Sequence, residues 1–187
     1  GRAQGVRAAA LGATTFVAGA ATLSVELAAS RVLSPYFGSS LYVWGSLIGV
    51  VLAGLAVGYW AGGLLADRYP YSLLLVAVLT VGAGAVLLVP LVDGPVLDWV
   101  VERDPGPRAS PLLAATILFL PASVILAGVS PIAVRLRAQS VGSVGSTAGR
   151  LFALSTAGSI AGTIGTAFWL VPELGTGQLF AFAAVAL

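Results

Sequence analysis

Apolar stretches long enough to cross a lipid bilayer follow one another along nearly the whole chain, separated by short polar segments. A helix needs about 20 mostly apolar residues to span about 30 Å of hydrocarbon. Of the 187 residues, 58% are hydrophobic and 9% are charged, whereas about 25% are charged in soluble domains. We therefore predict an all-α, polytopic membrane helix bundle that occupies residues 1–187 as a single transmembrane domain.

Several residue types that carry chemistry are absent from the sequence. It has no cysteine, histidine, lysine or methionine. Their absence excludes disulfides, thiolate and imidazole ligands, Schiff bases and a phosphate-binding Walker lysine. We expect neither a catalytic centre nor a metal site in this segment. The sequence has no basic cluster with interleaved aromatic residues, the pattern that would indicate nucleic-acid binding. The expected partner is therefore the lipid bilayer.

The pattern predicts about six transmembrane helices, at residues 7–33, 41–65, 72–92, 111–129, 148–171 and from 176 onward. Ser34-Pro35 and Ser130-Pro131 should end the first and fourth helices, because proline disfavours a helical residue before it. Pro121 should kink the fourth helix. From 176 to 187 there is room for only about 18 Å of helix, so we expect the native chain to continue beyond Leu187.

Short polar segments should connect the helices. Residues 66–70 are expected to form a tight loop, and residues 172–175 a short turn. Residues 93–110 are the longest polar segment, with a short helix over 96–103 lying on the membrane surface. The third helix is the most uniformly apolar and should face lipid.

The charges of these segments predict the orientation. If the N-terminus is cytoplasmic, the inside receives six arginines (Arg2, Arg7, Arg68, Arg135, Arg137 and Arg150) against one acid, Asp67. Arginine bias in short loops sets topology. We therefore expect both termini in the cytoplasm.

Small residues four positions apart mark the second helix. Gly45, Gly49 and Ala53 form one series, and Gly54, Gly58 and Gly62 form another. Such series allow close helix approach in lipid. A second small-polar series, Ser155, Ser159, Gly162 and Thr166, follows the fifth helix. The two Ser-Pro breaks, each followed by a helix rich in small residues, leave a 3+3 inverted repeat as an open interpretation.

Glu26 is the sharpest candidate for a site within the membrane. A charged residue there costs on the order of 2.5–3.5 kcal/mol to insert. With Thr15, Gly19, Thr22 and Ser30 it forms a polar stripe that should face the bundle interior. Arg31 lies five positions on, so a straight helix places it on another face. Two interpretations stay open: a hydrogen-bonded carboxyl that joins helices, or a proton or cation site for a solute, with Arg31 a ligand or an interfacial anchor.

Two groups of charges lie at the expected cytoplasmic face. Asp67 and Arg68 follow the second helix, where they either cap and anchor it or act as a conformational latch that pairs with a neighbour in one state only. Arg135, Arg137 and Arg150 lie in a segment without acids, whose glycines and serines predict a flexible basic loop.

Two stretches resemble the membrane region of bacterial spermidine synthase-like proteins, often described as fused major-facilitator/spermidine-synthase proteins. They are ASRVLSPYFGSSLYVWGSLIGVVLAGLAVGYWAGGLLADR within residues 26–68, and SPIAVRLRAQSVGSVGSTAGRLFALSTAGSIAGTIGTAFWLVPELG over 130–175. GGLLADR, at 62–68, is also similar to the major-facilitator loop between helices 2 and 3. The later glycine and basic residues of that motif are absent.

The resemblance implies a major-facilitator-like bundle in a bacterial inner membrane, followed by a cytoplasmic aminopropyltransferase-like domain. Such domains use decarboxylated S-adenosylmethionine and a diamine, and none of their residues is in this sequence. Three functions stay open. The first is a module that anchors that domain and handles its polyamine substrate or product. The second is a transporter or half-transporter of a small solute, such as a polyamine or another cation. The third is a structural subunit, alone or in a homo-oligomer.

Overall fold

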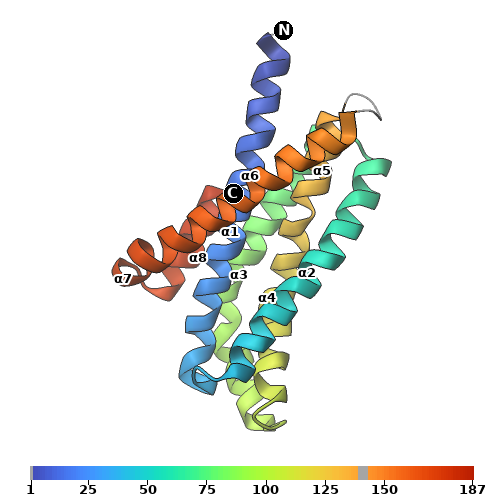
Figure 1. Ribbon diagram of the computed structural model, residues 1–187. Helices are drawn as coiled ribbons and strands as arrows, with labels where there is room; N and C mark the ends of the chain where they lie inside the picture. Colours follow the sequence, from blue (N-terminus) through green and yellow to red (C-terminus); the bar gives the residue numbers. More distant parts are fainter. Residues whose placement is uncertain (1, 139–142) are drawn as a thin grey trace.

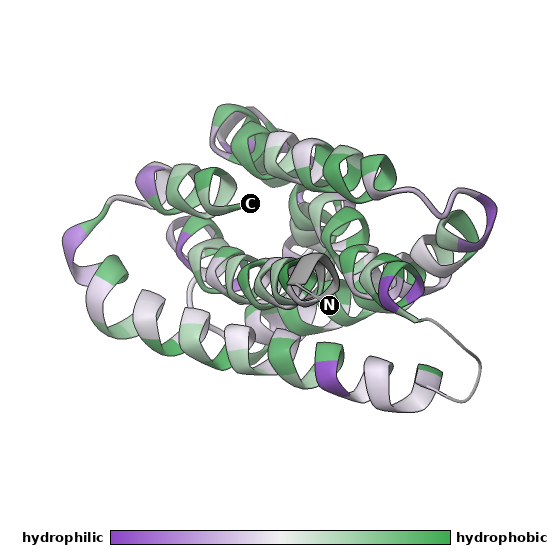
Figure 2. Ribbon diagram, turned by 90° about the horizontal axis from the view of Figure 1, so that it is seen from above, coloured by the Kyte–Doolittle hydropathy of each residue, from purple (hydrophilic) through white to green (hydrophobic). Residues whose placement is uncertain are grey.

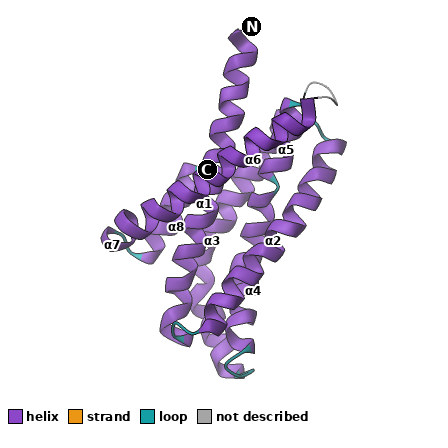
Figure 3. Ribbon diagram, in the orientation of Figure 1, coloured by secondary structure: helices purple, strands orange, loops and turns teal. Residues whose placement is uncertain are grey.

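The computed structural model describes residues 2–138 and 143–187, and the side chains of residues 2–4 and 7 are outside that description. All regular elements of the described residues are helical, with no strand (Figure 3). The long helices run up and down past one another in one bundle (Figure 1). The all-α prediction is therefore confirmed.

Five helical segments are long and apolar enough to cross a membrane: Ala8–Phe37, Leu41–Arg68, Ser72–Arg103, Ala109–Arg137 and Val144–Glu173. The first three correspond to α1 (Arg2–Phe37), α2 (Leu41–Arg68) and α3 (Ser72–Arg103). The fourth consists of α4 (Ala109–Ala127) and α5 (Val129–Arg137). The fifth consists of α6 (Val144–Gly165), a π-helical turn named η2 (Thr166–Leu170), and α7 (Val171–Glu173). The last helix, α8 (Thr176–Ala186), has 11 residues. These helices support a multi-pass membrane protein.

The end of α1 differs from the prediction. Ser34-Pro35 does not break the helix, which continues to Phe37. The Ser34 hydroxyl donates to the Ser30 carbonyl at 2.6 Å, and the Gly38 amide donates to the Ser34 carbonyl at 2.8 Å. These bonds complete the last turn around the proline. Gly38, whose φ of 72° suits glycine, ends the helix instead.

The predicted polar loop at 93–110 is also wrong, and the helix predicted over 96–103 is the end of α3 and not a separate surface helix. Helix α3 continues through both Pro90 and Pro95 to Arg103 and ends at Asp104, which has a φ of 40°. Leu97 and Val100 are fully buried on one side of this extension. Burial of that side keeps the segment in line with α3, so only residues 104–108 remain as the connection.

The other boundaries shift by smaller amounts. Helix α2 continues to Arg68, so the expected loop at 66–70 is reduced to residues 69–71. Helix α4 ends at Gly128, and Ser130-Pro131 lies in the first turn of α5, where proline needs no amide partner. Arg135 and Arg137 lie in α5 and Arg150 lies in α6, so the expected basic loop is mostly helical. Residues 139–142 of that loop are outside the described residues.

Two helix crossings organise the bundle: α1 packs most extensively on α6, and α2 on α4. Helix α8 packs on α1 and α3, and Phe180 stacks on Phe119 of α4 with ring centres 6.4 Å apart. Seen from above, hydrophobic residues cover outer as well as inner faces (Figure 2). Helix α3 has the highest mean hydropathy of the five spans, 2.6, and only 22% of its most apolar window is buried. This agrees with a lipid-facing position.

Candidate functional site

Glu26 is half-buried in α1. Among the described residues, none donates a hydrogen bond to its carboxylate or forms an ion pair with it. Two hydroxyls of the predicted stripe bond to their own helix: Thr22 donates to the Ala18 carbonyl at 2.8 Å, and Ser30 to the Leu27 carbonyl at 2.7 Å. The stripe therefore does not hold the carboxylate.

Arg31 contacts the other end of the chain. It is exposed, and its Nη1 donates to the Val171 carbonyl at 3.2 Å, across 140 positions. The acceptor is where the π-helical turn passes into α7. A cation is stabilised by the carbonyls at a helix C-terminus. Arg31 thus joins α1 to α7 and, as the helical spacing indicated, does not pair with Glu26.

Gly19 of the predicted stripe lies on the side of α1 that faces α6. Ser159 donates to the Gly19 carbonyl at 3.1 Å, and Thr166 donates to the Ser24 hydroxyl at 2.7 Å. An added Cβ on Gly158 or Gly162 would clash with α1 backbone, so both glycines are in direct contact with that helix. The series along the fifth helix therefore forms an interface. Ser24, which the stripe omitted, accepts the bond from the last residue of the series, Thr166.

One ion pair joins charged side chains in the described part of the chain. Arg135 Nε of α5 lies 3.3 Å from Asp67 Oδ1 of α2, and both side chains are largely exposed. The Arg68 guanidinium lies 5.8 Å from the centre of the neighbouring Tyr69 ring. Arg137 and Arg150 have no such partner among the described residues. The structure thus brings Asp67 and Arg135 together and leaves the other predicted charges apart.

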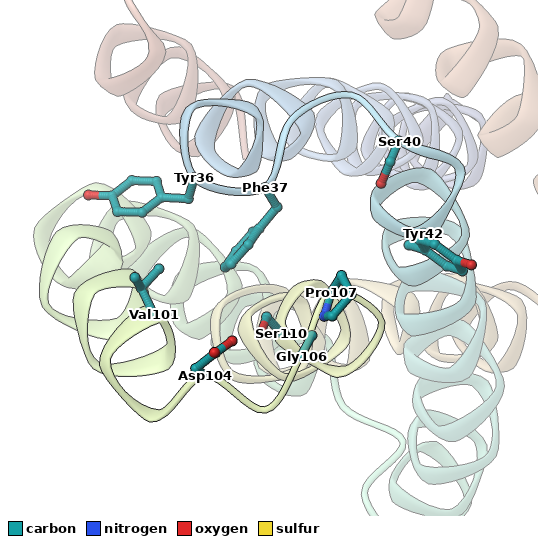
Figure 4. Close-up of a pocket in the computed structure, with 9 residues that line it drawn as sticks. All are labelled: Tyr36, Phe37, Ser40, Tyr42, Val101, Asp104, Gly106, Pro107 and Ser110. Atoms are coloured by element: carbon teal, nitrogen blue, oxygen red, sulfur yellow. Dashed lines mark hydrogen bonds between the residues drawn. The ribbon is translucent and has the colours of Figure 1, made fainter.

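A cavity of about 430 Å³ opens where the ends of α1 and α3 meet the starts of α2 and α4. In Figure 4, Phe37 projects into the middle, and the hydroxyls of Tyr36 and Tyr42 point away from it. Asp104 contributes a carboxylate. The Arg108 guanidinium lies 5.6 Å from the Tyr42 ring centre, so that ring already has a cation.

Sequence reasoning missed this cavity. The missing information was the length of α3, which brings Val101 and Asp104 beside the end of α1. Within the described residues, no group of acids is arranged to hold a metal ion.

No protein-family model, curated protein or solved structure matches this chain.

Proposed function

We propose that this chain is the membrane module of a spermidine synthase-like protein in a bacterial inner membrane, with both termini cytoplasmic. Two stretches of sequence that resemble that family carry the proposal. They contribute α2 and α6, the helices whose glycine faces pack in the two main crossings. The module holds an aminopropyltransferase-like domain at the bilayer and handles its polyamine substrate or product.

The proposed orientation is supported by the distribution of charge. Asp67, Arg68, Arg135 and Arg137 lie near the ends of α2 and α5, which meet at the top of Figure 1. The acids Asp98, Glu102 and Asp104 lie at the opposite end of the bundle, near the connection between α3 and α4. An arginine-rich end is expected to face the cytoplasm. Reporter fusions after residues 70 and 106 should be active on the cytoplasmic and outer sides, respectively.

The enzyme activity has a direct test in membranes from cells that express the complete gene. The aminopropyl group should pass from the sulfonium of decarboxylated S-adenosylmethionine to an amine of putrescine, forming spermidine and releasing methylthioadenosine and a proton. Spermidine should appear in these membranes and be absent from membranes of the empty host. If the complete product makes no spermidine, the enzymatic part of the proposal is wrong.

A transporter or half-transporter is the second candidate, favoured by Glu26, which is half-buried and has no partner among the described residues. A carboxylate inside a membrane helix is a functional-site candidate by default. Proteoliposomes should take up labelled putrescine or another small cation, and Glu26→Gln should abolish uptake while Glu173→Gln retains it. Absence of flux, or flux indifferent to Glu26, leaves the structural-subunit interpretation.

The proposal includes a 3+3 inverted repeat of the major-facilitator kind. Gly54, Gly58 and Gly62 of α2 pack on α4 and its junction with α5, and Gly158 and Gly162 of α6 pack on α1. In each crossing, the second helix of one three-helix unit meets the first helix of the other. This exchange supports the repeat, because a twofold relation between the units requires each such contact to occur twice.

A further inference from the structure

The helix boundaries in the second half of the bundle repeat those in the first half. Helix α3 begins at Ser72 and α8 at Thr176, a separation of 104 positions (176 − 72). The same separation places α2, residues 41–68, on residues 145–172, which α6 to α7 cover as 144–173. It also places residues 5–33 of α1 on residues 109–137 of α4 and α5. All three helices of each unit thus correspond in one register.

The packing contacts repeat in this register as well. Each contact joins the second helix of one unit to the first helix of the other. The contact of Gly58 with Val124 corresponds to the contact of Gly162 with Ala20. The contact of Gly62 with Gly128 corresponds to the contact of Thr166 with Ser24. In every match, each residue lies 104 positions from its counterpart. Two unrelated crossings would not share one separation.

Two apolar grooves are related by the same separation of 104 positions. A groove of about 260 Å³ between α2, α3 and α4 is lined in part by Gly58, Gly62 and Leu65. A groove of about 370 Å³ between α6, α8 and α1 is lined in part by Gly162, Thr166 and Trp169, the positions 104 residues later. The register therefore describes the shape of the two units and not only their contacts.

This register corrects the sequence markers of the repeat. Ser34-Pro35 and Ser130-Pro131 lie 96 positions apart (130 − 34), so they are not equivalent. Arg31 and Arg135 are separated by 104 positions, as are Asp67 and Val171. The contact of Arg135 with Asp67 and the contact of Arg31 with the Val171 carbonyl therefore occupy the same place in the two units.

We infer that Arg31 and Arg135 are equivalent residues of two inverted units, and that each closes one end of the bundle by tying the first helix of its own unit to the second helix of the other. This inference rests on the proposed inverted repeat. The end of α5 lies at the top of Figure 1 and the end of α1 lies at the bottom. The contacts differ in chemistry, because one acceptor is a carboxylate and the other is a backbone carbonyl.

Reactive thiols at two equivalent buried positions test the inference, and the cysteine-free sequence needs no prior substitution. Ala29 and Ala133 are both 0% exposed and each lies two residues before an arginine of interest. Ala29→Cys and Ala133→Cys are made separately in the full chain, in membrane vesicles. The rate of reaction with N-ethylmaleimide, which enters from either side, reports water access, because only the thiolate reacts.

Arg135→Gln should raise the rate at position 133 about fivefold, the population change expected for loss of a weak contact, and leave position 29 unchanged. Arg31→Gln should raise the rate at position 29 and leave position 133 unchanged. The control, Arg137→Gln, should change neither reaction rate. If either substitution raises both rates together, or changes neither, the idea of two separate end contacts is wrong.

A gain of contact tests the register itself. Val171→Asp places at position 171 the acid that the other unit has at position 67, so it should slow the reaction at position 29 several-fold. Val171→Asn is the matched control without the charge. If Val171→Asp has no more effect than Val171→Asn, the equivalence is overturned. Neither result depends on spermidine synthesis or solute flux, so failure here is distinct from failure of the proposed function.

Discussion

The two glycine series of α2 have the same spacing but different surroundings. A Cβ added to Gly54 or Gly62 would lie 2.6 Å from Ser123 Cβ or Gly128 Cα, so this series packs against α4 and its junction with α5. A Cβ added to Gly45 or Gly49 would have no atom within 4 Å. Spacing identifies a surface that permits close approach. It does not say which of two such surfaces has a neighbour.

The largest expected effect separates these two series. Gly58→Leu should lower the free energy of unfolding by about 1–3 kcal/mol, because its Cβ would reach the Val124 carbonyl and lie 2.5 Å from Ala127 Cβ. Gly49→Leu, on the same helix, should change it by less than about 0.5 kcal/mol. Unfolding of both variants in one detergent provides the measurement. If both variants lose the same free energy of unfolding, the two glycine series do not differ in packing.

An intermediate effect should distinguish the α1–α6 crossing from the α2–α4 crossing. Thr166 is 1% exposed and donates to Ser24, so Thr166→Val should cost about 0.6–1.7 kcal/mol. Thr163→Val is the control, because Thr163 bonds within its own helix to the Ser159 carbonyl. A double-mutant cycle with Ser24→Ala isolates the pair. A coupling energy of zero would mean that the Thr166–Ser24 bond does not stabilise the α1–α6 crossing.

The smallest effect is expected where α2 meets α5. Asp67 and Arg135 are 76% and 48% exposed, so Asp67→Asn should cost no more than about 1 kcal/mol at low salt. At 1 M salt, where screening extends over about 3 Å, the difference should disappear. Unfolding titrations at both salt concentrations, with Glu173→Gln as control, measure it. A loss that persists in high salt would mean that the contact is not a surface ion pair.

Sequence periodicity predicted the helical class and the starts of most helices, because apolar length and turn residues determine them. It failed where local and tertiary effects compete. Ser34-Pro35 resembles a break, but the Ser34 hydroxyl and the Gly38 amide supply the bonds that keep the turn helical. Asp98 and Glu102 make the end of α3 look like a separate surface helix, but Leu97 and Val100 are buried on its other side.

The candidate site was predictable only in part, for a related reason. The spacing of Glu26 and Arg31 correctly separated them. The polar stripe was less informative, because Thr22 and Ser30 can satisfy their hydroxyls within α1 and need no facing helix. The contact of Arg135 with Asp67 joins residues far apart in sequence, and only the folded arrangement reveals it.

The length of α3 has a practical consequence. Its 32 residues extend about 48 Å, well beyond the roughly 30 Å of hydrocarbon in a bilayer. Its last turns carry Asp98 and Glu102, so with the start of α4 they should form a helical hairpin that projects into the aqueous phase. The Pro105–Gly106 bond at its tip offers an insertion point for an epitope tag, and the first accessible bond for a protease added on that side of the membrane.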